Sequence, residues 1–230
     1  MNKMSNIRIS RHQIGRFRLL LWSLMLIIGL RPLLDEWIGG RIWANVFTDI
    51  FFACALISGL HAVSGQTRQL RLALLLAGAI IILVTLHYTL KIQALDRLQL
   101  ALSAVFLMQM LVMIWIHIEK ENEVTIDLIM ASACAYILLG LVWAYAYYLL
   151  EIFHPNSFKA SENMSDDIWN FYYYSFVTLT TMGYGDILGI TKSARALSIL
   201  EAITGQLYLA IMISRLVGLH ASQSGISKGK

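Results

Sequence analysis

The chain has 230 residues, of which 58% are hydrophobic, and its mean hydropathy is +0.65. This composition excludes an ordinary soluble domain, because so much apolar surface would aggregate in water, and it indicates that a lipid bilayer is the solvent. The formal net charge of +4 is modest and lies mostly near the ends of apolar runs, so it carries topology information and predicts no nucleic-acid partner.

Apolar runs of about twenty residues predict transmembrane helices, since that length of α-helix crosses the hydrocarbon core of a bilayer. In chain order the predicted spans lie near 17–34, 42–63, 69–90, 98–118, 124–150 and 193–217. A shorter amphipathic helix near 166–180 cannot span, and we interpret it as re-entrant, because non-helical backbone at membrane depth needs protein or water around it. The predicted fold class is therefore an all-α membrane protein with six transmembrane helices and one re-entrant helix.

The distribution of Lys and Arg predicts the orientation of these spans. Basic residues without acids occupy the first twenty residues and the connection between the second and third spans: Lys3, Arg8, Arg11, Arg16, Arg18, Arg68 and Arg71. Both segments are expected in the cytoplasm, which places both termini there in a multi-pass protein of the cell membrane, with an uncleaved first span. The bias is incomplete, because other basic residues fall on the outer side: Arg31, Arg41, Lys91, Arg97 and Lys192.

The two cysteines and the connection 117–127 do not predict a catalytic or metal-binding site. Cys54 and Cys134 both lie inside apolar runs, at spacings that suit packing rather than a disulfide framework or a metal site. The connection 117–127 is acidic, with Glu119, Glu121 and Glu123 among its residues. It is either a solvated turn or a site for divalent cations, protons or the basic N-terminal arm, and we prefer the solvated turn.

The residues from Thr180 to Asp186 read Thr-Thr-Met-Gly-Tyr-Gly-Asp, with long apolar segments on both sides. This motif resembles the filter of the potassium channel pore family, whose usual form is Thr-Val-Gly-Tyr-Gly. The resemblance implies that K+ is coordinated by the backbone carbonyls of residues 181–184 and by the Thr181 hydroxyl, within a filter of Thr181, Met182, Gly183, Tyr184 and Gly185. Gly183 and Gly185 are expected at positive φ, which lets successive carbonyls turn the same way. No other cofactor is expected.

The resemblance covers the chain from Glu123 to His220 and assigns supporting roles around the filter. Tyr173 and Tyr174 stand where relatives often have two Trp residues that brace the filter tyrosine, and Thr180 and Asp186 flank the filter. Met182 departs from the common Val or Ile. Its carbonyl is unchanged, so we expect altered filter rigidity more than lost selectivity, with the side chain packed behind the filter.

The last predicted span carries the candidate gating residues. Gly205 has the spacing of the family's inner-helix glycine, and either a hinge or close helix packing would explain it. Counting helical turns from Gly205 predicts pore-lining positions at Gln206, Leu209, Ile213 and Val217, with the last two as candidates for a dewetting gate. Glu201 is an intramembrane acid, which is expensive in lipid; it either links the inner helix to the pore helix or binds an ion.

The four helices before the pore unit lack the residues of a voltage sensor. A sensor needs Lys or Arg at every third position, because each charge moved through 100 mV is worth about 2.3 kcal/mol. The stretch from Leu98 to Ile116 contains neither residue type. Steep voltage gating is therefore predicted to be absent.

These interpretations divide the chain into four parts. They are a basic cytoplasmic arm (1–16), a four-helix transmembrane domain without sensor arginines (17–118), a pore domain (119–220) and a short cytoplasmic tail (221–230). Within the pore domain lie an outer helix (124–150), a pore helix (166–180), the filter segment (181–186) and an inner helix (193–217). A soluble regulatory domain is not expected in a tail of this length.

The predicted function is passive, potassium-selective conduction without enzyme activity. One filter segment cannot surround an ion, so the expected partners are three further copies in a homotetramer and the membrane lipid. The alternatives are a less selective monovalent cation channel, in which Met182 loosens the filter, a potassium transporter subunit, and a non-conducting membrane protein. The single intact motif argues against the transporter, because such proteins fuse four degenerate copies in one chain.

Overall fold

The computed structural model describes residues 16–38, 67–90, 93–160 and 167–228. In chain order its elements are α1 (Arg16–Ile38), α3 (Thr67–Leu90), α4 (Gln93–Lys120), α5 (Ile126–Phe153), β1 (Phe158–Ala160), α6 (Ile168–Leu179), β2 (Ile187–Gly189) and α7 (Lys192–Lys228). The predicted span 42–63, most of the basic arm and Cys54 lie outside the described residues.

Three of the predicted spans are confirmed as helices long and apolar enough to cross a membrane. They are Arg97–Lys120 in α4, Ile126–Phe153 in α5 and Lys192–Gln223 in α7. The predicted spans 17–34 and 69–90 are also helical, as α1 and α3, although their apolar stretches among the described residues are shorter, Phe17–Leu30 and Arg71–Leu83. Six spans therefore stay a prediction.

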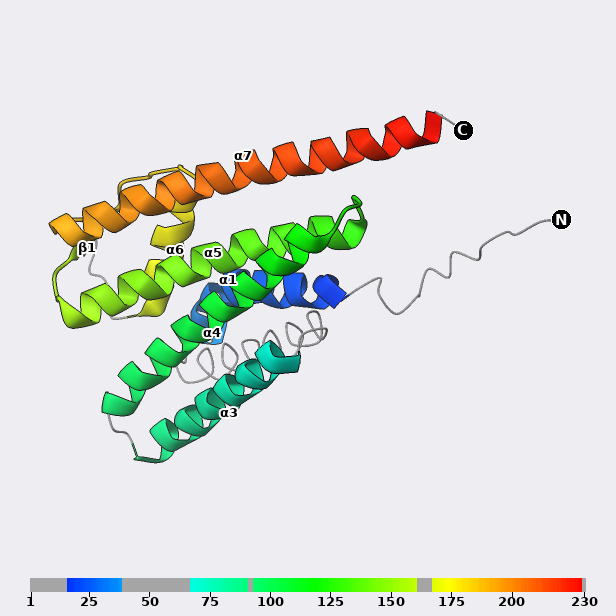
Figure 1. The fold of residues 1–230 in the computed structure, drawn as a ribbon. Helices are drawn as coiled ribbons and strands as arrows, with labels where there is room; N and C mark the ends of the chain where they lie inside the picture. The colour runs from blue at the N-terminus through cyan, green and yellow to red at the C-terminus, as the bar shows by residue number, and fades with distance from the viewer. Residues whose placement is uncertain (1–15, 39–66, 91–92, 161–166, 229–230) are drawn as a thin grey trace.

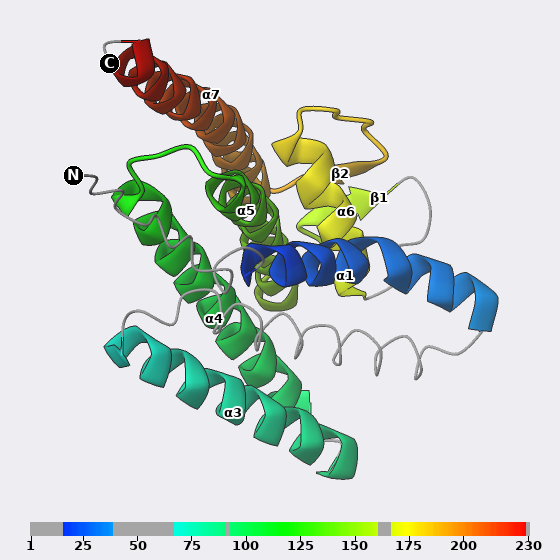
Figure 2. The same cartoon turned by 90° about the vertical axis from the view of Figure 1, so that its right-hand side faces the viewer.

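Helix α5 lies at the centre of the fold. It packs against α1, α4, α6 and α7, while α3 packs on α4 (Figure 1). Figure 2 shows α1 crossing beside α5 in the direction of α6. Small residues on α5 allow these close approaches, and Ala131, Ala135 and Ala144 are all fully buried. Thr125 begins the helix as its N-cap, accepting a hydrogen bond from the Leu128 amide.

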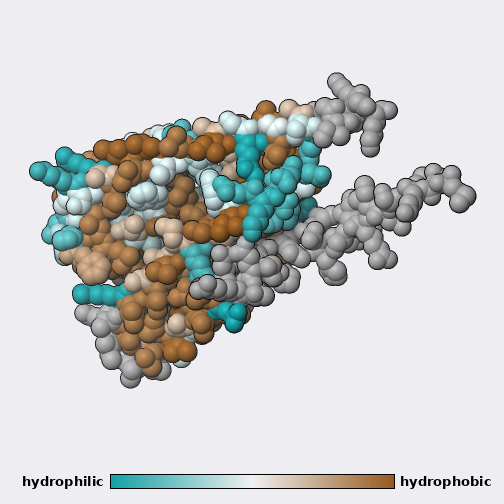
Figure 3. Space-filling view, in the orientation of Figure 1, coloured by the Kyte–Doolittle hydropathy of each residue, from teal (hydrophilic) through white to brown (hydrophobic). Residues whose placement is uncertain are grey.

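Helices α4 and α5 form an antiparallel pair joined by a short turn over residues 121–125. A turn of this length forces the second helix back along the first. α4, the last helix before the predicted pore domain, thus packs against α5 of the same chain. Hydrophobic side chains cover much of one molecular face between polar patches at its two ends (Figure 3).

A two-stranded sheet, which the all-α prediction missed, joins the chain before α6 to the chain after the filter segment. β1 pairs antiparallel with β2, with Phe158 opposite Gly189. The turn that precedes β1 is held by the Glu151 carboxylate, which accepts amide hydrogen bonds from Asn156, Ser157 and Phe158 at 2.7, 2.9 and 3.2 Å. Three-residue strands carry too little alternation to be recognised in sequence.

The helix boundaries in the predicted pore domain differ from the prediction most at the end of α7. α7 continues to Lys228, well past the predicted end at 217, so the predicted tail 221–230 begins inside this helix. The end of an apolar run marks where hydrocarbon stops and not where helical hydrogen bonding stops, and no proline follows to interrupt it. α6 covers Ile168–Leu179, within the predicted range 166–180, and Asp167 is its N-cap.

Candidate functional site: the filter segment and the helices that hold it

The filter segment leaves the C-terminal end of α6 in a left-handed conformation. Gly183 and Gly185 have φ of 56° and 80°, which confirms the prediction of positive φ at both glycines. Thr181 also has positive φ, 60°, which was not predicted. A β-branched residue rarely adopts this region, so its surroundings must hold it there.

Backbone hydrogen bonds to the last turn of α6 hold this conformation. The amides of Met182 and Gly183 both donate to the Val177 carbonyl, at 3.0 and 3.3 Å, and the Thr181 amide donates to Thr178 at 3.0 Å. The Thr181 hydroxyl donates to the Thr180 carbonyl at 2.6 Å, which leaves its lone pairs available to a cation. The end of α6 therefore fixes where the filter segment begins.

The filter residues lie on the surface of the single chain. Residues 181–185 are all exposed, including Met182 at 59% and Tyr184 at 66%. The side chains of Met182 and Tyr184 line a groove of about 260 Å³ whose other walls include Tyr173, Val177 and Ile28 of α1. One copy of the chain thus presents the segment without enclosing it.

Tyr173 contacts the filter segment at two points. Its ring stacks on Tyr184, with centroids 6.5 Å apart and planes 11° apart, and its hydroxyl donates to Asp186 Oδ2 at 2.7 Å. The hydrogen bond to Asp186, with smaller contributions from desolvation and nearby charge, raises the pKa of Tyr173 to about 12. Tyr173 therefore brackets Gly185 between a ring contact and a hydrogen bond.

Tyr174 points away from the filter, toward α5 and α7. Its hydroxyl lies 2.6 Å from Ser198 Oγ, and its ring meets those of Tyr147 and Phe158 edge-on at 5.0 and 5.3 Å. Only one of the two tyrosines assigned to the brace contacts Tyr184 in the chain. Thr180 forms the C-cap of α6, and its hydroxyl donates to the Phe176 carbonyl at 2.6 Å.

Glu201 links three helices from a fully buried position. Its carboxyl accepts a hydrogen bond from Tyr147 of α5 and forms a second hydrogen bond with Ser175 of α6, both at 2.5 Å, and the side chain is 0% exposed. Ser175 Oγ also lies 2.7 Å from the Gly140 carbonyl. A serine hydroxyl has one proton, so both contacts of Ser175 are hydrogen bonds only when Glu201 Oε1 carries a proton and donates it to Ser175.

Gly205 and Gly140 allow α7 and α5 to approach α6 closely. A Cβ at Gly205 would lie 2.6 Å from the Leu179 carbonyl oxygen, and one at Gly140 would lie 2.6 Å from the Phe176 ring. α7 runs through Gly205 as one continuous helix. The structure thus supplies the packing reason for Gly205, and the hinge stays a prediction.

The predicted pore-lining residues share an exposed strip of α7. Gln206, Leu209, Ile213 and Val217 are all exposed in the single chain. The buried strip of α7 is rotated by about 100°, one residue of an α-helix, from this exposed strip. It includes Glu201, Gly205, Tyr208 and Met212.

Arg215 is a functional candidate that the sequence reasoning missed. Its Nη2 donates to the carbonyls of Ile118, Glu119 and Glu121 at 2.9, 2.9 and 3.2 Å, so it caps the C-terminal end of α4. Its buried Nε has no hydrogen-bond partner among the described residues. The sequence did contain a signal for it, because Arg215 is a basic residue near the end of an apolar span. The contact joins the acidic turn to the region of Ile213 and Val217.

Comparison with known proteins supports an ion channel at this site. Residues 133–219, which contain most of α5, all of α6, the filter segment and most of α7, match a family model described as Ion channel (Ion_trans_2). Protein LctB of Bacillus caldotenax is 25% identical over 128 residues, covering 53% of this chain and 95% of that protein. No solved structure matches the chain. The match supports an ion channel pore family and, with it, passive ion conduction.

The contact between Tyr173 and Asp186 predicts a specific pH dependence. Because the pKa of Tyr173 rises from 10 to about 12 on folding, its stabilisation is fully present below pH 10 and is lost as the pH rises from 10 to about 12. Tyr173→Phe should lower the Tm slightly, by the equivalent of at most about 1 kcal/mol for a solvent-screened contact. The Tm difference from wild type should stay constant below pH 10 and shrink as the pH rises from 10 to about 12. A difference of undiminished size at pH 12 would contradict the assignment.

The hydrogen bonds of Glu201 predict that glutamine replaces it better than alanine does. Glu201→Gln can still accept from Tyr147 and donate to Ser175, so its Tm should fall little. Glu201→Ala leaves two buried hydroxyls without a partner and opens a cavity, which together cost on the order of 2–4 kcal/mol. Thermal unfolding of both variants in detergent compares them. Equal losses for the two would show that the carboxyl group does not link the helices as described.

Proposed function

We propose that the protein conducts potassium ions passively and selectively across the cell membrane as a homotetramer, with both termini in the cytoplasm. The observation that carries the proposal is the backbone of residues 181–185, which leaves the end of α6 with Gly183 and Gly185 at positive φ. This conformation is what turns successive carbonyls toward one path, and rings of backbone carbonyls can replace the hydration shell of K+.

The tetramer follows from the exposure of the filter segment and of α7. A carbonyl array can strip a cation of water only if it surrounds the ion, and one chain leaves residues 181–185 open on its surface. Large apolar side chains also stand exposed along α7, including Leu209 at 37%, Ile213 at 60% and Val217 at 62%. A closed ring of identical copies would cover part of both surfaces at once.

The helices around the filter segment form a scaffold that holds it in place. Ser175 and Tyr147 hold Glu201, and Gly205 lets α7 lie against the end of α6. The C-terminal end of α6 lies at the start of the filter segment, where the negative end of its dipole favours a cation. The buried, hydrogen-bonded position of Glu201 favours a linking role over an ion site.

Opening of this channel is proposed not to depend steeply on voltage. α4 carries no Lys or Arg between Leu98 and Ile116, and α4 folds directly back onto α5. No row of charges in α4 can therefore move through the membrane field. The hydrogen bonds of Arg215 to the end of α4 give α4 a mechanical connection to α7 without such charges.

A less selective monovalent cation channel is the second candidate, and one observation favours it. Met182 is 59% exposed and borders the open groove behind the filter segment, so its flexible side chain leaves the rear of the filter loosely packed in the single chain. If neighbouring copies do not fill that groove, the carbonyl rings could widen and admit Na+.

Potassium flux from liposomes holding the purified protein tests the proposal. Wild type should release K+ down its gradient, and Gly183→Ala should abolish release, because an alanine at φ of 56° is strained by about 1–2 kcal/mol in every copy. Gly78→Ala is the matched control: its Cβ would meet nothing within 4 Å, and its φ is not positive. Absence of flux in wild type, or equal flux in both variants, would contradict the proposal.

A further inference from the structure

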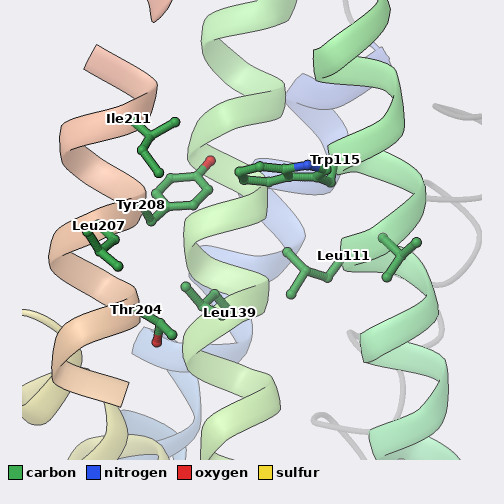
Figure 4. Close-up of a pocket in the computed structure, with 8 residues that line it drawn as sticks. Leu111, Trp115, Leu139, Thr204, Leu207, Tyr208 and Ile211 are labelled. Atoms are coloured by element: carbon green, nitrogen blue, oxygen red, sulfur yellow. The ribbon is translucent and has the colours of Figure 1, made fainter. Parts of the chain in front are cut away.

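An apolar groove of about 370 Å³ lies between α4 and α7, with α5 as its floor. Figure 4 shows side chains of α4 and α7 facing one another across α5. The lining residues are Leu111, Val112 and Trp115 of α4, Leu139 of α5, and Thr204, Leu207, Tyr208 and Ile211 of α7. None of them belongs to the filter segment or to the predicted pore strip.

The polar groups of the lining side chains are already satisfied inside the chain. The Tyr208 hydroxyl donates to the Ser132 carbonyl at 2.6 Å, and the Thr204 hydroxyl donates to the Glu201 carbonyl at 2.9 Å. Trp115 Nε1 donates to Glu119 Oε1 at 3.1 Å. What remains in the groove is hydrocarbon and ring faces. An occupant that needs hydrogen bonds would lose them there, whereas an alkyl chain would lose none.

The groove lies at the depth of the hydrocarbon core. All its lining residues fall within the three helices that are long and apolar enough to span a membrane: 97–120, 126–153 and 192–223. Water is scarce at that depth, so the abundant candidates to fill the groove are acyl chains and the side chains of a neighbouring copy.

Helix geometry distinguishes these two occupants. Thr204, Leu207 and Ile211 each lie two residues before one of the predicted pore positions, Gln206, Leu209 and Ile213. Two residues of α-helix turn through about 200°, so the groove and the pore strip lie on opposite sides of α7. In a ring with the pore strip inward, the groove therefore faces outward, away from the axis and toward the bilayer. This step rests on the proposed function.

We propose that the groove binds one acyl chain of a membrane phospholipid. The acyl chain would lie between Trp115 and Leu139 on one side and Leu207 and Ile211 on the other. Its contacts with Thr204 and Tyr208 flank Gly205, where α7 packs on the end of α6. A lipid of the bilayer would thereby fill the space between α4 and α7.

Photo-crosslinking in liposomes tests the proposal. The full chain is reconstituted in phosphatidylcholine containing a fraction of phosphatidylcholine with a diazirine at mid-chain, irradiated, and digested for mass spectrometry. Labelling should be severalfold higher at Trp115 and Leu207 than at Leu74 and Leu75, which are exposed apolar residues of α3. Equal labelling at the two sets would overturn the proposal. Groove residues free of label would show that a neighbouring copy fills the groove.

Two matched variants separate groove binding from general contact with lipid. Val112→Phe fills part of the groove and should lower its labelling severalfold. Val105→Phe is the control, because Val105 lies seven residues earlier on the same face of α4, is similarly exposed (54% against 46%, the exposed fraction of Val112) and does not line the groove. Identical labelling in both variants would overturn the proposal.

The same liposomes separate this proposal from the proposed function. Labelling is measured without reference to ion flux. Groove labelling in protein that passes no K+ would support the acyl-chain site and count against potassium conduction. K+ flux without groove labelling would support potassium conduction and count against the acyl-chain site.

Discussion

The left-handed backbone at Gly183 and Gly185 is the constraint on which the rest of the candidate site depends. An ordinary strand alternates its carbonyls, so a row of carbonyls along one path requires residues that tolerate positive φ. Such a backbone has few internal hydrogen bonds and must be held from outside. The structure supplies that support from the Val177 carbonyl below the segment and from Tyr173 and the β1–β2 pairing around Asp186.

The supporting contacts lead back to α5 and α7 through α6. Ser175 places a hydroxyl between Glu201 and Gly140, and the glycines at 140 and 205 remove side chains where α6 approaches. A buried acid at membrane depth is costly unless it is neutral or fully hydrogen-bonded, and the pattern of donors and acceptors around Glu201 fits the neutral form. Polar linkage and close packing thus act on the same short helix that positions the filter segment.

Sequence reasoning succeeded where the cause is local. The apolar runs located the long helices that the structure describes, and the glycines of the filter segment have the positive φ that their lack of a side chain allows. These features depend on a few neighbouring residues, so a single sequence contains the information.

The features that sequence reasoning missed are set by contacts between distant residues. Arg215 donates to backbone carbonyls almost a hundred positions earlier in the chain. Because every residue has a backbone carbonyl, the residue types at those positions do not reveal the contact. Tyr174 and Tyr173 are adjacent in sequence, yet one turns to Ser198 and the other to Asp186, because neighbouring positions on a helix face different elements. The positive φ of Thr181 likewise follows from its bonds to the end of α6.

Ion selectivity tests the central claim most directly. Reversal potentials are measured on reconstituted protein with K+ on one side of the bilayer and Na+ on the other. Carbonyl rings built from residues 181–185 should set the reversal potential close to that of a membrane permeable to K+ alone. A reversal potential near zero, showing that Na+ passes as readily as K+, would contradict the account.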